Sequence, residues 1–177
     1  LVVAALCVAG CARGTPPESS TPEATTAPAV ASAPAASTTA AVPTADTATT
    51  LVAYQWQLKS ATDAAGQSIT ALFPSPDKPL GLLFGDGRIN VTGSCNRMSA
   101  GYQLLDTVQL QASPGPSTMM ACPPPLADAD DAIARFLSGT LQVALEGESG
   151  APQLRLAAAN GSTLTFAGTP TPETRFG

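Results

Sequence analysis

Cysteine is the residue best suited to chemistry in this 177-residue chain, which contains four cysteines and no histidine. Without histidine, Ser-His-Asp and Cys-His catalysis and most zinc or copper sites are excluded. Cys7 and Cys11 lie near the first residue, whereas Cys95 and Cys122 lie far apart and form no CxxC motif. In an exported chain this second pair is suited to a disulfide, and a reactive or metal-binding thiol pair is the alternative.

The first eleven residues indicate export. Residues 1–10 form a short apolar run without a charge, and Val8-Ala9-Gly10-Cys11 resembles the lipobox of bacterial lipoproteins. Such a run is too short to span a bilayer, which takes about 20 apolar residues. We therefore expect residues 1–10 to be the remnant of a lipoprotein signal peptide and Cys11 to carry the lipid. The residue after Cys11 is Ala12, whereas an aspartate at this position usually retains lipoproteins in the inner membrane. We therefore expect the protein to be anchored at the periplasmic face of the outer membrane.

The next segment and the overall charge limit the partners. Residues 11–50 consist almost wholly of Ala, Thr, Pro and Ser without apolar periodicity, and we predict a lipidated, disordered tether. The chain has a net charge of −5 and only 12% charged residues. It therefore lacks the basic surface that nucleic acids require, and we expect membrane contact only through the lipid.

From residue 51 onward the pattern predicts a mainly β domain with one helix, of the α+β class. Short alternating or apolar runs, separated by turn residues such as Asp86-Gly87 and Asn160-Gly161, predict eight strands. They cover residues 54–58, 80–84, 88–92, 101–104, 108–110, 141–145, 153–157 and 163–166. Trp56, the only tryptophan, is predicted to anchor the core. Such a sheet needs closure or cover to avoid exposed edges.

One helix is predicted between residues 128 and 138. Asp128 is its expected N-cap, Asp130 and Asp131 favour a helix N-terminus, and Gly139 follows as the stop. Ile133, Phe136 and Leu137 form its apolar stripe. The three aspartates lack the glycine and glutamate of a calcium loop, so we expect no metal there.

Two short stretches resemble the META domain, the domain of a heat-shock-inducible bacterial lipoprotein. They are Gly93-Ser-Cys-Asn-Arg-Met-Ser-Ala-Gly-Tyr102 and Ser117-Thr-Met-Met-Ala-Cys-Pro123. The resemblance implies a compact, β-barrel-like domain over residues 51–168 with a helix packed against it, followed by a disordered tail, 169–177. The residues that carry the family motif are Gly93, Asn96, Gly101, Tyr102, Thr118 and Met119.

These motif residues suit structural roles. The two glycines are expected at strand ends, Asn96 in a turn of its own backbone, and the ring of Tyr102 in the core. Residues 118–120 are expected to form a strand that meets the loop around Asn96. The resemblance thereby brings Cys95 and Cys122 together, and we predict a structural disulfide.

The leading hypothesis is an envelope-anchored META-domain lipoprotein without enzymatic activity, acting in stress response or as an interaction module. No catalytic residue, metal or cofactor is expected, and a monomer with an unidentified envelope partner is the expected state. One alternative is a lipoprotein that binds a small hydrophobic ligand or peptide, as pilot proteins do. The other is a thiol-dependent enzyme, which requires Cys95 or Cys122 to be free.

Overall fold

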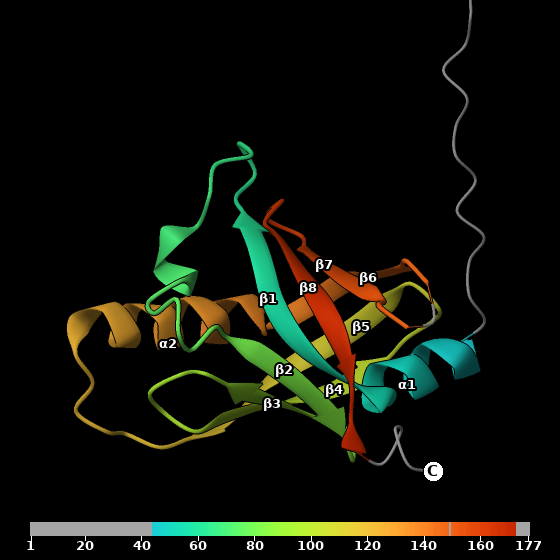
Figure 1. Ribbon diagram of the computed structural model, residues 1–177, viewed down its shortest axis with the longest axis horizontal. Helices are drawn as coiled ribbons and strands as arrows, with labels where there is room; N and C mark the ends of the chain where they lie inside the picture. The colour runs from blue at the N-terminus through green and yellow to red at the C-terminus, as the bar shows by residue number, and fades with distance from the viewer. Residues whose placement is uncertain (1–43, 149, 173–177) are drawn as a thin grey trace, which may run out of the picture. The chain divides into compact units, whose positions relative to one another are not determined.

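The computed structural model describes residues 44–148 and 150–172, and its eight strands form one closed antiparallel barrel (Figure 1). The strands follow one another around the barrel in sequence order, and the last pairs with the first. The elements are α1 Thr44–Ala53, β1 Tyr54–Thr62, the 3-10 helix η1 Thr70–Leu72, β2 Gly81–Gly85, β3 Arg88–Thr92, β4 Met98–Leu104, β5 Gln109–Ser117, α2 Pro124–Phe136, β6 Gly139–Glu146, β7 Gln153–Ala158 and β8 Thr163–Pro170. The predicted mainly β, barrel-like class and the eight strands are confirmed.

Because every neighbouring pair of strands is antiparallel, alternate connections lie at the same end of the barrel. We call these the α1 end and the α2 end. The α1 end carries three hairpin turns, and the α2 end carries the long loops 63–80 and 93–97, the segment 118–138 and the turn 159–162. Figure 1 shows the two helices on opposite sides of the strands.

Alternating side chains fill the barrel. In β1, Trp56 and Leu58 are buried while Gln55 and Gln57 are exposed, as the period of two requires. The indole of Trp56 is fully buried, and its Nε1 donates a hydrogen bond to the carbonyl oxygen of Leu51, 2.9 Å away. Trp56 therefore anchors the core, as predicted.

Helix α2 covers the core with its predicted stripe, but it begins earlier than predicted. Ile133, Phe136 and Leu137 are buried, whereas Pro123 is the N-cap and Pro124 opens the first turn. Proline suits this position because its fixed φ is helical and its missing N–H would have no intrahelical partner. Asp128 is therefore not the N-cap, and the first turn contains no acidic residue.

The folded part also exceeds its predicted limits. Helix α1 starts at Thr44, within the segment predicted to be a disordered tether, and Thr47 and Leu51 are buried in it. At the other end β8 runs to Pro170, and the amide of Thr171 donates to the carbonyl of Ala53.

Several predictions concern residues outside those that the structure describes. These are the signal remnant, the lipidation site Cys11, the tether up to residue 43 and the tail from residue 173. Within the described ranges, no helix has both the length and the apolar character needed to cross a membrane.

Candidate functional site

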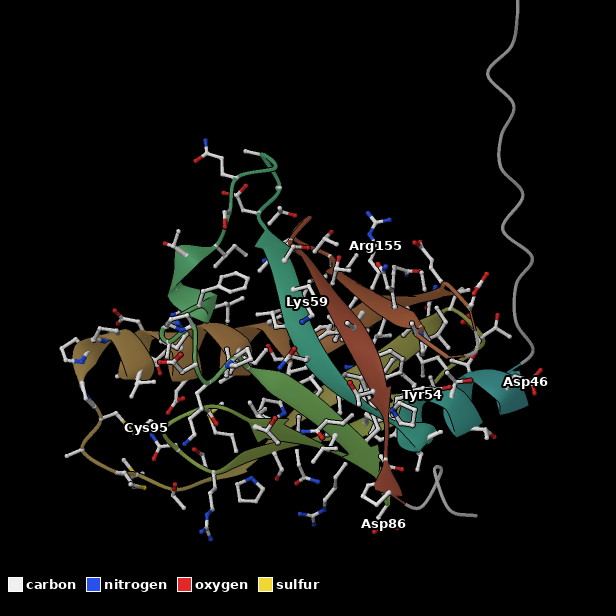
Figure 2. All side chains as sticks on the ribbon, in the orientation of Figure 1. Asp46, Tyr54, Lys59, Asp86, Cys95 and Arg155 are labelled. Atoms are coloured by element: carbon white, nitrogen blue, oxygen red, sulfur yellow. A yellow bond between two sulfur atoms is a disulfide. The ribbon has the colours of Figure 1, made fainter. Side chains whose placement is uncertain are left out.

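Two segments at the α2 end carry most of the family motif. We call residues 93–97, between β3 and β4, the Cys-Asn loop, and residues 118–123, between β5 and α2, the Met-Met segment. A disulfide joins Cys95 of the first to Cys122 of the second, with 2.06 Å between the sulfurs and 6.2 Å between the Cα atoms. The bridge predicted from the sequence is therefore present. Figure 2 shows Cys95 far from Asp86 and Tyr54, which lie toward the α1 end.

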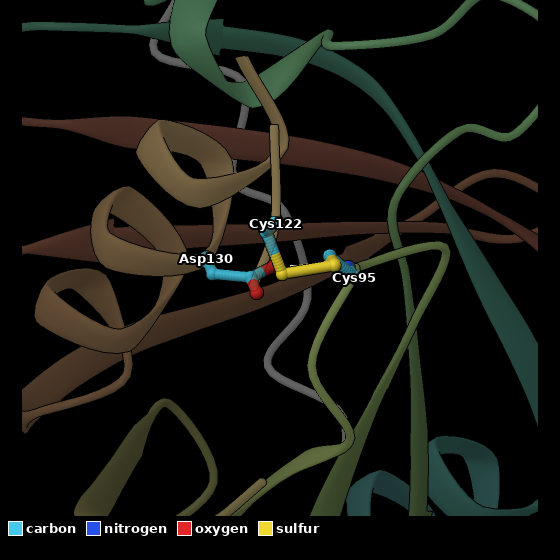
Figure 3. A group of neighbouring side chains, drawn as sticks. All are labelled: Cys95, Cys122 and Asp130. Atoms are coloured by element: carbon cyan, nitrogen blue, oxygen red, sulfur yellow. Dashed lines mark hydrogen bonds between the residues drawn. A yellow bond between two sulfur atoms is a disulfide. The ribbon is translucent and has the colours of Figure 1, made fainter. Parts of the chain in front are cut away.

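Asp130 is the third member of this site, and sequence reasoning missed it. Its side chain is only 5% exposed, and it points from α2 toward the disulfide (Figure 3). Its carboxylate accepts hydrogen bonds from the amides of Cys95, at 3.1 Å, and Asn96, at 2.8 Å. It accepts a third from Nδ2 of Asn96, at 2.9 Å. The carboxylate therefore binds the Cys-Asn loop. The predicted role of Asp130 at the helix N-terminus is wrong.

The spacing between Asp130 and the apolar residues of α2 could have predicted that the side chain of Asp130 is buried. Asp130 lies three residues before Ile133 and seven before Leu137, so it belongs to the buried stripe of α2. A carboxylate in an apolar stripe must find hydrogen-bond donors, because an unpaired buried charge is costly. The sequence thus indicates a buried partner, although it does not name one.

Asn96 links the two segments through both ends of its amide. Its Nδ2 donates to Asp130 and lies 3.4 Å from the sulfur of Cys122. Its Oδ1 accepts hydrogen bonds from Oγ1 of Thr118, at 3.1 Å, and from the amide of Met120, at 2.7 Å. The expected role in its own backbone turn is therefore wrong. The hydroxyl of Ser94 makes that local contact instead, donating to the carbonyl of Asn96.

Thr118 completes the connection, and the methionines that follow it are exposed. Its Oγ1 accepts a hydrogen bond from the amide of Arg97, and its own amide donates to the carbonyl of Arg97. The side chains of Met119 and Met120 are 99% and 60% exposed. The strand predicted over residues 118–120 is absent, because these hydrogen bonds tie the segment to one loop and no ladder continues beyond Ser117.

The remaining motif residues are Gly93, which begins the Cys-Asn loop, and Gly101 and Tyr102, which lie in β4. Gly93 has a φ of +78°, and a Cβ there would clash with the carbonyl oxygen of Pro79, so glycine is required. Gly101 lies inside β4, not at a strand end as predicted. Tyr102 packs edge-to-face on Phe84, with ring centroids 5.2 Å apart. Burial, reinforced by the negative charge of Asp86, raises the pKa of Tyr102 above its ordinary value.

Two hollows open at the α2 end. One, of about 440 Å³, borders the Met-Met segment, and its lining includes Arg97, Met98 and Thr118. The other, of about 430 Å³, lies between α2, η1 and the turn before β8. Its apolar lining includes Ile69, Leu72 and Phe136, and its charged lining is Arg135 alone.

Only one group of three or more cysteine or acidic side chains in the described part has its potential ligand atoms close enough to hold a metal. The two sulfurs of the disulfide and a carboxylate oxygen of Asp130 all lie within 4.8 Å of one another. As long as the sulfurs are bonded to each other, the group acts as a cross-link supported by hydrogen bonds.

Comparison with known proteins identifies a family and a fold. The sequence model of the META domain matches residues 49–171. None of the curated proteins matches the chain. Among solved structures, an NMR structure of a protein from Burkholderia xenovorans matches with a TM-score of 0.58 and 24% sequence identity, over 84% of this chain and 98% of that one. At that identity the likeness shows the barrel fold alone.

Proposed function

Because this chain belongs to the META domain family, we propose that it is a non-enzymatic lipoprotein of the bacterial envelope whose barrel is an interaction module. The observation that carries the proposal is the exposed methionine pair on a firmly held segment. Met119 is 99% exposed, while its neighbours Thr118 and Met120 are hydrogen-bonded to Asn96. Methionine adapts its shape to apolar partners, and an immobilised support lowers the entropic cost of binding.

The polar groups of the family motif support a structural role for the motif itself. Asn96, Thr118 and Asp130 all bond to one another or to nearby backbone. No buried side-chain nitrogen or oxygen in the described residues lacks a hydrogen-bond partner. The polar atoms of the motif hold the Cys-Asn loop and the Met-Met segment together, so they fix the surface that these two segments form. Atoms engaged in this way are less free to act on a substrate.

Photo-crosslinking in living cells tests the interaction. A photoreactive amino acid replaces Met119 in the full chain, and the matched control replaces Val108, which is 41% exposed in a turn at the α1 end. We expect a discrete crosslinked envelope protein from position 119 and none from position 108. Equal products from both positions, or none from position 119, would contradict the proposal.

Anchoring at Cys11 is supported by the apolar run and the lipobox-like residues that precede it. Metabolic labelling with palmitate tests it, with Cys11→Ser as the variant and Cys7→Ser as the control. The first should abolish labelling, while the second should leave it intact because Cys7 lies in the removed segment. Fractionation then tests the destination, since Ala12→Asp should move the protein from the outer to the inner membrane. Label retained on Cys11→Ser would refute the anchor.

The stress-response part of the proposal rests on the family resemblance. It predicts that a strain lacking the protein survives a heat challenge less well than the parent, and that the complete gene restores survival. Complementation by the Cys11→Ser form to the same level would separate the stress role from the membrane anchor.

The hollow beside α2 favours a second candidate function, the binding of a small amphiphile with a carboxylate. Its volume of about 430 Å³ lies within the range of ligand pockets. Its lining combines one charged residue, Arg135, with apolar side chains such as Leu72 and Phe136. Native mass spectrometry of the delipidated protein with medium-chain fatty acids tests this candidate. Arg135→Gln should abolish the adduct, and Arg97→Gln, which borders the other hollow, should retain it.

The third possibility, a thiol-dependent enzyme, requires a free thiol at Cys95 or Cys122. Alkylation of unfolded, unreduced protein taken directly from the periplasm counts the free thiols by intact mass. We expect no alkylated cysteine in the mature domain, and two would place this enzyme hypothesis first.

A further inference from the structure

We propose that the reduced form of this domain binds a soft divalent cation, such as Zn²⁺ or Cd²⁺, between Cys95, Cys122 and Asp130. The three side chains already converge, with their potential ligand atoms within 4.8 Å of one another. They come from three separate segments, the Cys-Asn loop, the Met-Met segment and α2. The inference is independent of the interaction proposed for Met119, because it uses none of the exposed methionine surface.

The convergence does not depend on the disulfide alone. Four hydrogen bonds join the Cys-Asn loop to the Met-Met segment without involving sulfur, through Thr118 and through the amide of Met120. Three more join the loop to Asp130. When the sulfur–sulfur bond breaks, these seven contacts keep the thiols facing each other. A site that is already assembled binds metal without the cost of ordering its ligands.

Reduction and metal binding balance as two steps. A dithiol or phosphine reductant supplies two electrons, two protons add from the reductant or the solvent, and the S–S bond becomes two thiols. The reductant becomes a disulfide or, with oxygen from water, a phosphine oxide. The cation then replaces the two thiol protons, which pass to the buffer, and bonds to both sulfurs. Cys95 and Cys122 are only partly buried, so both steps are accessible from solvent.

The donor set suits this class of metal. Thiolates prefer Zn²⁺, Cd²⁺ and similar soft cations, and Zn²⁺ takes ligands at about 2.3 Å from sulfur and 2.0–2.2 Å from oxygen. A carboxylate has about four lone-pair positions, and those of Asp130 receive three hydrogen bonds, so one remains on Oδ1. Nδ2 of Asn96, 3.4 Å from the sulfur of Cys122, would support the metal-bound thiolate. Water would fill the fourth position.

Cadmium titration tests the site in the full chain carrying Cys7→Ser and Cys11→Ser, which leaves Cys95 and Cys122 as the sole thiols. The protein is reduced with a phosphine, freed of reductant without oxygen, and titrated with Cd²⁺ while the ultraviolet thiolate-to-cadmium absorption is recorded. We expect the absorption to saturate at one cation per chain. The oxidised protein should show no such absorption, and a large excess of Zn²⁺ should lower the absorption of the reduced protein by competing with the more tightly bound Cd²⁺ for the two thiolates.

Variants assign the ligands. Asp130→Asn should weaken cadmium binding at least about tenfold, whereas Asp128→Asn, exposed on the same helix, should leave it unchanged. Cys122→Ser retains the carboxylate and should lose the absorption, which tests the site even if Asp130→Asn unfolds on reduction. The proposal is overturned if reduced protein gives no saturable absorption, if its circular dichroism shows a lost fold, or if both aspartate variants bind like the parent.

Discussion

Replacing Asp130 with alanine removes the one acceptor that holds the Cys-Asn loop to α2. The amides of Cys95 and Asn96 and the Nδ2 of Asn96 each lose a charge-assisted hydrogen bond of 2.8 to 3.1 Å. Since Asp130 is only 5% exposed, water reaches the vacated position poorly. The disulfide still ties the loop to the Met-Met segment, so the loop loses its link to the helix while its other anchor remains.

The size of the effect follows from the three lost bonds. A buried donor left without a partner costs about 1–3 kcal/mol, and the partly buried loop lies at the lower end of that range. We therefore expect Asp130→Ala to lower the free energy of unfolding by about 3–5 kcal/mol. Asp130→Asn keeps one acceptor oxygen but places its own N–H group against a donor. It should therefore lower the free energy of unfolding by less than Asp130→Ala does. Asp128→Ala, on the exposed face of α2, should change stability by no more than about 0.5 kcal/mol.

Equilibrium unfolding in urea, without reductant, measures all three variants. The midpoint of Asp130→Ala should fall while the slope with denaturant stays that of the parent, because the barrel still unfolds as one unit. Combining Asp130→Ala with the loss of the disulfide should lower the free energy of unfolding by less than the sum of the two separate effects. The reason is that the hydrogen bonds to Asp130 and the disulfide constrain the same loop. An Asp130→Ala protein as stable as Asp128→Ala would refute the reasoning, because it would mean that the three hydrogen bonds contribute nothing net.

Three further predictions concern the disulfide, Gly93 and Tyr102. Replacing Cys95 and Cys122 with serine should cost about 2–4 kcal/mol, because a bridge with a sequence separation of 27 restricts the unfolded chain, and circular dichroism should still show a folded β domain. Gly93→Ala should cost at least about 2 kcal/mol more than Gly66→Ala in the same unfolding assay, since both glycines have positive φ but only the first meets a neighbouring carbonyl. The raised pKa of Tyr102 favours the folded state while the phenol is protonated, so its contribution is complete below the unfolded value of 10.0 and is lost as pH rises through the folded-state value. Its replacement with phenylalanine should therefore flatten the alkaline decline of the thermal midpoint, and an unchanged decline would contradict this.

The parts of the fold that were predictable from sequence are those governed by neighbours along the chain. Alternation of Trp56 and Leu58 with glutamines is sufficient to identify a half-buried strand. Asp86 and Gly87, with φ of 49° and 68°, form the expected tight turn between β2 and β3. In both cases the deciding interactions lie within a few residues.

Contacts distant in sequence explain what was missed. Helix α1 contains little but Thr and Ala around Leu51, and it is stabilised by contacts with the barrel, including the bond from Trp56 to its last turn. The sequence predicted a strand over residues 108–110 alone, yet β5 continues through Pro114 and Pro116 to Ser117. This is possible because β6 pairs only with residues 109–112, so beyond them β5 has a free edge where a missing N–H costs nothing.

The interaction through Met119 and the cation site at Cys95, Cys122 and Asp130 respond differently to reduction of the disulfide. Seven hydrogen bonds and one disulfide fix the Cys-Asn loop, so a change in the redox state of sulfur alters its chemistry more than its shape. Binding through Met119 should therefore persist in the reduced protein, whereas cation binding should appear only there. A crosslink at position 119 that disappears on reduction would show that the hydrogen bonds do not hold the loop. It would weaken the metal site and leave the envelope anchor at Cys11 untouched.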